Sequence, residues 1–342
     1  MKKILSLILV FILTVTLAAC GGNGEGADNT SKGKAPASSD TSTGDKFTLV
    51  RGTEYTEFQN GNNVIVCFGD SITRGWDSPS GYVYPDQLES NLKGQYKVLN
   101  SGVYGETAAT ISSRANSIDF CLSQDVVFPA GTDRVDLDRE LFMTAAGEKI
   151  TYLEFGYDLP HDTVIINGQK YTIEYAKTDK YQHGIYTLVR SNAAKALTLK
   201  KGTPVQYDYL AQIDSVYCAI VLMGANDGDS GSDELIAKYR KFAEKYPRHI
   251  LIMPFYYTDQ NAKFEAAFGK NAVNIRDYLV NHAAVDYDQE LSELDLYCVR
   301  KNTVPTVFSY KQKRGDVHLS SLGYKVLADQ VYKRGVELGY WK

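Results

Sequence analysis

The chain has 342 residues, of which 44% are hydrophobic and 23% are charged, and its formal net charge is −4. This is the composition of a globular protein, and the length leaves room for more than one folded unit. The charge balance gives no sign of the basic face that nucleic-acid-binding domains usually carry, so we expect no nucleic-acid partner.

The first 20 residues have the pattern of a lipoprotein signal peptide. Lys2 and Lys3 precede an apolar run, 4–17, that is too short for a membrane span. The following Ala18-Ala19-Cys20 resembles the bacterial lipobox, in which the cysteine is acylated and becomes the mature N-terminus. The alternative is an ordinary signal peptide that contains a cysteine by chance. The resemblance implies a lipid on Cys20 that anchors the protein to the bacterial cell membrane, outside the cytoplasm.

Residues 21–46 contain mostly small and polar side chains, with almost no large apolar residue. Such a segment is typical of a flexible linker. We therefore expect the folded part to begin at residue 47.

Four runs predict strands of a parallel sheet, at 64–68, 96–99, 216–223 and 249–253. The run at 96–99 is shorter and includes Lys97, whereas the other three have the continuous hydrophobicity of buried strands. Cys67 and Cys218 fall inside two of these runs and are predicted to be buried thiols. Cys121 and Cys298 lie outside them, and the sequence leaves open whether they pair in an oxidising compartment.

Helical patterns alternate with these runs. One follows the third run, with apolar residues of 235–243 on one face, and another spans about 264–283. A last helix begins after Ser320 or Ser321, either of which can cap it. The alternation predicts an α/β fold with a parallel sheet, built from 47–118 and 210–342.

Residues 119–209 break this alternation. Short strand patterns separated by turns occur here, at 126–128, 149–155, 163–166, 171–175, 185–189 and 205–209. Asn167 and Gly168 both tolerate positive φ, and between two strand patterns they predict a hairpin. We therefore predict that 119–209 forms a β-rich subdomain inserted into the α/β domain.

A serine follows the first buried strand directly, in the run Gly69-Asp70-Ser71-Ile72-Thr73. The carboxyl end of a parallel strand, at the start of a helix, is where α/β folds place their sites. Backbone N–H groups at a helix start also favour developing negative charge. By itself the run is also compatible with an ordinary turn.

Four motifs in fixed order resemble those of the SGNH, or GDSL, hydrolase family. They are the run at 69–73, the N-x-G-x-x-G-x-T pattern at 100–107, Gly224-Ala225-Asn226-Asp227, and Asp316-Val317-His318. The resemblance covers about 63–113 and 214–342. It implies a flavodoxin-like α/β hydrolase domain of three layers, which the β-rich subdomain interrupts.

The resemblance also assigns roles. Ser71 is the nucleophile and His318 its general base, since a serine hydroxyl needs a base to take its proton and histidine titrates near neutral pH. The oxyanion donors are the N–H groups of Ser71 and Gly105 and the side-chain amide of Asn226. Structural roles are expected for the other histidines, His161, His183, His249 and His282.

The last motif departs from the family pattern, in which an aspartate lies three residues before the histidine. Gly315 occupies that position, and the nearest carboxylate is Asp316, two residues before His318. In an extended segment, side chains two residues apart point the same way, so the usual orienting contact is in doubt. Asp316 orients His318 only if a turn brings it back; the alternatives are another orienting group and a Ser–His dyad.

Other residues near these motifs have weaker assignments. Asp70 and Asp227 are expected to brace their loops, with a catalytic role as the lesser alternative. Arg74, Trp76 and Tyr82 follow the nucleophile and are candidates for lining a substrate cleft, with local packing or solvent exposure as the equal alternative.

The sequence thus predicts a serine esterase that hydrolyses an ester through a Ser71 acyl-enzyme. No cluster of metal-ligand residues is evident, and the chemistry needs no metal or organic cofactor. An O-acetyl group on a glycan or another extracellular substrate is the expected target, by analogy alone. The alternatives are an O-acyltransferase acting on a cell-wall sugar and a non-catalytic glycan-binding lipoprotein. A lipase is disfavoured because no long apolar lid is visible.

Overall fold

The structure is a computed structural model, and it describes residues 63–76, 78, 82–137, 141–150, 163–177, 184–208, 216–228, 232–255 and 261–342. The predicted signal peptide and linker, residues 1–46, lie outside the described residues. Across the described ranges, no helix has both the length and the apolar character needed to cross a membrane.

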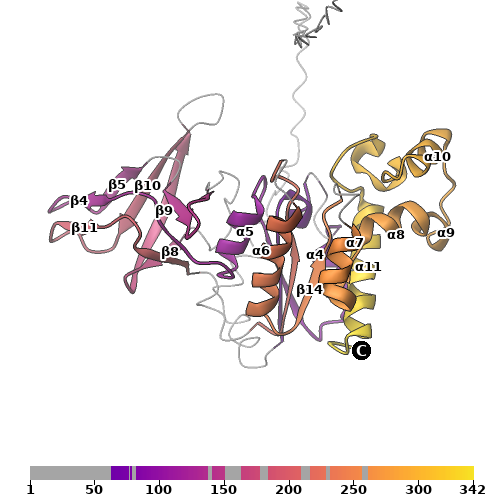
Figure 1. Cartoon of the computed structure of the whole chain (residues 1–342), viewed down its shortest axis with the longest axis horizontal. Coiled ribbons are helices and arrows are strands. Elements are labelled where there is room, and N and C mark those ends of the chain that lie inside the picture. Colours follow the sequence, from indigo (N-terminus) through magenta and orange to yellow (C-terminus); the bar gives the residue numbers. More distant parts are fainter. Residues whose placement is uncertain are drawn as a thin grey trace, which may run out of the picture. The chain divides into compact units, whose positions relative to one another are not determined.

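A five-stranded parallel sheet forms the centre of the α/β part (Figure 1). Its strands are β1 (Val64–Gly69), β2 (Lys97–Gly102), β13 (Cys218–Leu222), β14 (His249–Ile252) and β15 (Ala272–Val273). They lie in the order β15-β14-β13-β1-β2. The strands on either side of β1 are therefore β2 and β13, and the loops that leave the carboxyl ends of these three strands start at one edge of the sheet.

The prediction of one helical stretch near 264–283 is wrong in its middle. The segment divides into α7 (Asn261–Phe268), the 3₁₀ helix η4 (Gly269–Asn271), β15 and α8 (Ile275–Asn281). Two strand residues are too few to show an alternating sequence pattern. They form β15 because they pair with β14 at the sheet edge. Asn274 then caps α8 by accepting the N–H of Asp277 at 3.1 Å.

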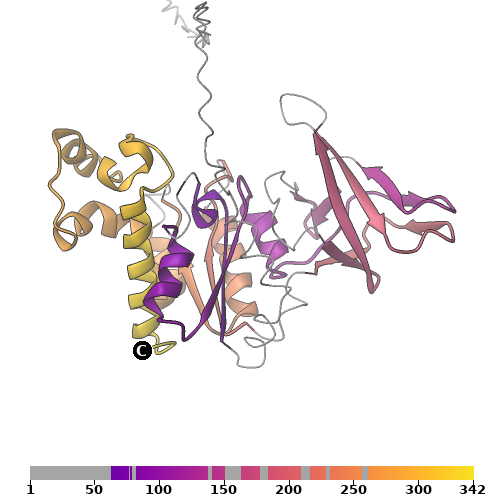
Figure 2. The ribbon, with the colours of Figure 1, turned by 180° about the vertical axis from the view of Figure 1, so that it is seen from behind.

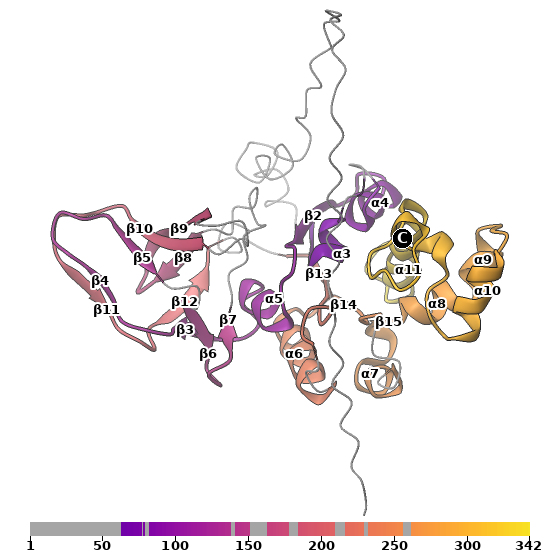
Figure 3. The same cartoon turned by 90° about the horizontal axis from the view of Figure 1, so that it is seen from above.

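Helices cover both faces of the parallel sheet, as Figure 3 shows. Along β1, Val64, Val66 and Phe68 point to one face and Ile65 and Cys67 to the other, as strand geometry requires. The first face packs against α5 (Ala108–Arg114), α6 (Ser232–Lys245) and α7, and the second against α4 (Tyr84–Asn91), α8 and α11 (Ser321–Glu337). The remaining described helices are α3 (Ser71–Arg74), α9 (Ala283–Asp286), α10 (Glu293–Arg300), η5 (Thr306–Phe308) and η6 (Tyr310–Gln312).

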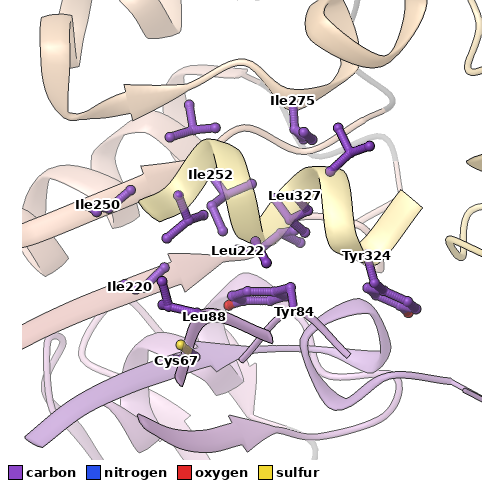
Figure 4. Packing of buried hydrophobic residues seen from close by; sticks show 14 of the residues in the cluster. Cys67, Tyr84, Leu88, Ile220, Leu222, Ile250, Ile252, Ile275, Tyr324 and Leu327 are labelled. Carbon is purple, nitrogen blue, oxygen red and sulfur yellow. The ribbon is translucent and has the colours of Figure 1, made fainter. Parts of the chain in front are cut away.

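The core on the second face joins distant parts of the chain (Figure 4). Tyr84 and Leu88 of α4 share this core with Tyr324 and Leu327 of α11. The two helices lie side by side in Figure 2, and the Asn91 side chain donates to Asp329 at 3.0 Å. This packing fixes the start of α11, and hence the loop before it, relative to β1.

Ser320, and not Ser321, caps α11, because the Ser320 side chain accepts the N–H of Gly323 at 3.2 Å.

The four described cysteines are free thiols. Cys67 and Cys218 are fully buried, as predicted. Cys121 and Cys298, whose pairing was left open, are each free.

Antiparallel strands occupy most of the described residues between Phe120 and Tyr207. The larger sheet has the order β5-β10-β9-β8-β12-β3-β6-β7, and β4 pairs with β11. The strands are β3 (Phe120–Leu122), β4 (Val126–Phe128), β5 (Arg134–Leu137), β6 (Phe142–Thr144), β7 (Lys149–Ile150), β8 (Thr163–Ile166), β9 (Gln169–Lys177), β10 (Gly184–Arg190), β11 (Leu197–Leu199) and β12 (Pro204–Tyr207). The predicted hairpin at Asn167-Gly168 joins β8 to β9, with φ of 51° and 73° at its two residues.

Four of these strands, β3, β5, β6 and β11, have no counterpart in the sequence prediction. Each has only three or four residues, too few to establish an alternation. They are stabilised by pairing and by a shared core of their own, which includes Phe120, Phe142 and Leu199. The predicted strand at 149–155 is seen as β7, and its remainder lies outside the described residues.

Candidate active site

Ser71 lies at the carboxyl end of β1, at the first position of α3. Asp70 caps this short helix, because its Oδ1 accepts the N–H of Ile72 at 2.9 Å. The cap fixes the turn between strand and helix, and it leaves the Ser71 side chain 8% exposed. The local sequence therefore forms the strand–turn–helix placement that the motif predicts.

His318 reaches Ser71 from the other end of the chain. Its Nε2 lies 2.9 Å from Ser71 Oγ, a hydrogen-bonding distance across 247 residues of sequence. A backbone hydrogen bond closes the loop that carries His318, because the N–H of Tyr310 donates to the His318 carbonyl at 2.8 Å. The nucleophile and base predicted from the first and last motifs are thus brought together.

Asp316 curls back to the same histidine. Its Oδ1 accepts the backbone N–H of His318 at 2.9 Å and lies 3.3 Å from Nδ1 of the ring. The extended geometry that placed this contact in doubt is absent, because an aspartate side chain readily bonds the backbone two residues on and so closes a turn. With the carboxylate at Nδ1, the favoured tautomer carries its proton there and leaves Nε2 to accept from Ser71.

Burial sets the protonation of the base. Partial burial lowers the pKa of His318 below its ordinary value, and Asp316 opposes this by favouring the charged ring. Because the net direction is downward, the ring is neutral at neutral pH. A neutral imidazole next to Ser71 is the state that a general base needs.

The second motif packs directly onto the nucleophile turn. Gly102, at the end of β2, approaches so closely that a Cβ there would lie 2.2 Å from the backbone nitrogen of Arg74. The N–H of Val103 donates to the Gly69 carbonyl at 2.9 Å. Only glycine permits this approach, which explains the first glycine of the pattern in physical terms.

Gly105 and Asn226, the two further oxyanion candidates, belong to loops that contact each other. Gly105 has φ of 71°, a left-handed conformation that favours glycine. The Asn226 amide donates to the carbonyl of Glu106 at 3.0 Å, and Asp227 accepts the N–H of Ala108 at 2.9 Å. Asp227 therefore braces the two loops, as expected. That the Gly105 N–H and the Asn226 amide serve an oxyanion at Ser71 stays a prediction.

A buried ion pair that the sequence analysis missed ties the motifs together. Arg114, at the end of α5, is 0% exposed, and its Nη2 lies 2.6 Å from Glu106 Oε2. The same guanidinium donates to the Gly69 carbonyl at 3.3 Å and to the Ser101 hydroxyl. One cation thus contacts the nucleophile turn, the end of β2 and the loop that follows it. The only sequence signal was an arginine in a helix whose other residues are small or apolar.

Of the three flanking residues, Trp76 contacts His318. The Trp76 ring stacks on His318, with ring centroids 5.4 Å apart and planes 22° apart, and meets Tyr104 edge-on at 5.2 Å. The Arg74 carbonyl accepts from the Asn100 side chain at 3.4 Å, which is local bracing. Tyr82 is 53% exposed.

The other histidines have the structural settings that were expected, where they are described. His249 Nδ1 lies 2.7 Å from the Tyr246 carbonyl, and His282 ends α8. His161 and His183 lie outside the described residues. Within the described part of the chain, no group of three histidine, cysteine or acidic side chains is placed to hold a metal ion.

Two cavities in the described part of the chain are lined by residues other than Ser71. One of about 590 Å³ is lined by α6 and by the turn between β6 and β7, including Lys238 and Glu148. A smaller cavity of about 280 Å³ lies beside the loop that carries His318, and its lining includes Asp316, Val317 and Phe255. The candidate site is identified instead by the hydrogen-bonding contact between the side chains of Ser71 and His318.

No family model and no curated protein matches the chain. Among solved structures it is similar to a protein described as lipolytic and of the G-D-S-L family from Desulfitobacterium hafniense, with 13% identity, coverage of 80% of this chain and 99% of that one, and a TM-score of 0.38. A carbohydrate acetylesterase family member from Sinorhizobium meliloti is 12% identical, with coverage of 81% of this chain and 99% of that one and a TM-score of 0.34. AlinE4, an SGNH-hydrolase family esterase, is 16% identical, with coverage of 81% of this chain and 96% of that one and a TM-score of 0.30. The solved structures that this chain resembles are thus SGNH/GDSL-type hydrolases, esterases and acetylesterases, at low identity and low TM-score.

Proposed function

We propose that the protein is a serine ester hydrolase of the SGNH/GDSL type, with Ser71 as nucleophile. The observation that supports it is the relay from Asp316 through His318 to Ser71, with Nε2 2.9 Å from the serine oxygen. A nucleophile in contact with a base, and the base in contact with an orienting carboxylate, is the arrangement that acyl transfer requires.

In the proposed reaction His318 takes the Ser71 proton as Oγ attacks the ester carbonyl. The tetrahedral oxyanion is held by the N–H groups of Ser71 and Gly105 and by the Asn226 amide. His318 then gives the proton to the leaving alcohol, which departs and leaves an acyl group on Ser71. Water, activated by the same base, attacks this acyl-enzyme and releases the acid.

The substrate we propose is an O-acetyl ester on a glycan outside the cytoplasm. The support is the N-terminal pattern that ends at Cys20, because a lipid anchor would hold the domain on a membrane face where such polymers occur. Labelled palmitate should enter the wild-type protein in a bacterial host and fail to enter Cys20→Ala. Absence of label from the wild type would refute the anchor and leave the esterase proposal intact.

Turnover of p-nitrophenyl acetate by the purified full chain tests the hydrolase proposal. We expect saturable release of p-nitrophenol that a serine-directed fluorophosphonate abolishes. A rate equal to that of the heat-denatured protein would reject the proposal. It would favour a non-catalytic protein instead.

A further inference from the structure

Trp76 lies against His318, the general base of the proposed active site. It lies two residues after α3, and its backbone N–H donates to the Ser71 carbonyl at 3.0 Å. Its ring stacks on His318 at 5.4 Å and is supported edge-on by Tyr104 at 5.2 Å. Contacts on two sides therefore hold the indole in one orientation beside the reacting atoms.

The indole is nevertheless 40% exposed. The Trp341 ring, by contrast, is 4% exposed and lies in the core. An apolar aromatic surface that is held in place and left open to solvent gains most from a ligand that covers it. Its position next to His318 indicates which half of an ester would do so.

The chemistry of acyl transfer indicates which half of the ester, acyl or alcohol, lies against Trp76. Once Ser71 Oγ has bonded to the acyl carbon, collapse of the tetrahedral intermediate breaks the bond from that carbon to the alcohol oxygen, and the proton held on His318 Nε2 passes to that oxygen. The alcohol half must therefore lie against His318. The acyl half lies toward the oxyanion donors, on Gly105 and Asn226. A side chain stacked on the His318 ring borders the alcohol half.

We infer that Trp76 is the wall of a subsite for the alcohol half of the substrate, and that this alcohol is a pyranose sugar; the inference rests on the proposed ester hydrolysis. A pyranose ring presents a flat face of C–H groups and a polar rim. An indole presents a flat apolar face with one N–H at its edge, so the two surfaces match. A short linear alcohol has no flat face to cover the indole.

The kinetic test compares two acetates that share the acyl group and differ in the alcohol, an acetylated methyl pyranoside and ethyl acetate. Trp76→Ala should lower kcat/KM for the pyranoside about tenfold more than for ethyl acetate, whereas Trp76→Phe should keep most of the difference between the substrates. Any disturbance of His318 affects both substrates and cancels in the ratio. An equal loss on both would overturn the subsite. Failure of the wild type on both would instead reject the hydrolase.

A binding measurement tests the subsite without turnover. The chain has only two tryptophans, Trp76 and the buried Trp341, so its fluorescence reports on Trp76 well. In Ser71→Ala, which cannot be acylated at that position, the acetylated methyl pyranoside should change the emission in a saturable way. The change should be lost in Ser71→Ala/Trp76→Phe. A saturable change of the same size in both proteins, or none in either, would overturn the inference.

Discussion

Asp316 and His318 are joined through a single carboxylate oxygen, which accepts the His318 backbone N–H at 2.9 Å and also lies 3.3 Å from Nδ1. The backbone contact closes the turn, and this turn brings the carboxylate next to the His318 ring. The same oxygen thus both shapes the loop and orients the base, with the contact to the ring the longer of the two.

This shared contact predicts a partial role for the carboxylate. Asp316→Asn should lower kcat by about 10- to 100-fold, less than the roughly 10⁴-fold loss when the aspartate of a fully formed triad is changed to asparagine. The asparagine oxygen can still accept the backbone N–H, so the loop should keep its turn. Steady-state kinetics with p-nitrophenyl acetate, with circular dichroism as the folding control, measures this. A loss near 10⁴ would indicate a full triad, and no loss would remove Asp316 from the site.

The pH profile should report the base. His318 must be neutral to accept the Ser71 proton, and burial lowers its pKa below the ordinary value of about 6.5. The acid limb of kcat/KM should therefore have its midpoint below that value. Because Asp316 raises the pKa of His318, Asp316→Asn should move this limb to still lower pH. A limb that moves to higher pH in the variant would contradict the assignment.

The buried pair of Arg114 and Glu106 should matter for stability and for the site. Arg114→Met leaves a carboxyl buried without its cation and should cost about 3–5 kcal/mol. Arg134→Met is the matched control, because Arg134 pairs with Glu174 on the surface, where a pair contributes at most about 1 kcal/mol. Urea unfolding measures both.

The double variant Arg114→Met/Glu106→Leu separates the two roles. Replacing both charges should recover much of the lost stability. It does not restore the contacts of Arg114 with Gly69 and Ser101, so kcat should stay below that of the wild type. Full recovery of kcat together with stability would show that the pair is structural only.

Asp70 should make stability fall as the pH rises. Burial is the main cause that raises its pKa to about 7, and only one carboxylate oxygen, Oδ1, has a hydrogen-bond partner. The unfolded chain releases this proton near pH 4, so between about pH 4 and 7 the folded state binds more protons and loses stability, up to about 4 kcal/mol, as the pH rises. Asp70→Asn should therefore raise Tm by at least about 2 °C at pH 8 and by little at pH 4. An equal change in Tm at both pH values would contradict this origin.

The sequence was sufficient where chemistry is local. The strand before Ser71, the cap of α11 at Ser320 and the hairpin at Asn167 each depend on a few adjacent residues, and all three are observed. The continuous apolar runs of β1 and β13 also predicted strands buried in a sheet covered on both faces, and the structure shows that these two strands pair.

Tertiary contacts decided what the sequence did not show. The two residues of β15 are a strand only because β14 lies beside them. The contact of Asp316 with His318 depends on a local turn, whereas an extended segment would have kept the two side chains parallel. Arg114 and Trp76 gain their roles from partners on other elements, Gly69 and His318, which no spacing along the chain identifies.

Kinetics of Ser71→Ala, His318→Ala and the double variant test the central claim most directly. Because the two residues act as a unit, each single variant should reduce p-nitrophenyl acetate turnover to near background, and the double variant should be little worse than either. All three should keep the native circular dichroism spectrum, since neither side chain lies in the apolar core. A Ser71→Ala protein that is folded and turns over the ester at the wild-type rate would contradict the account.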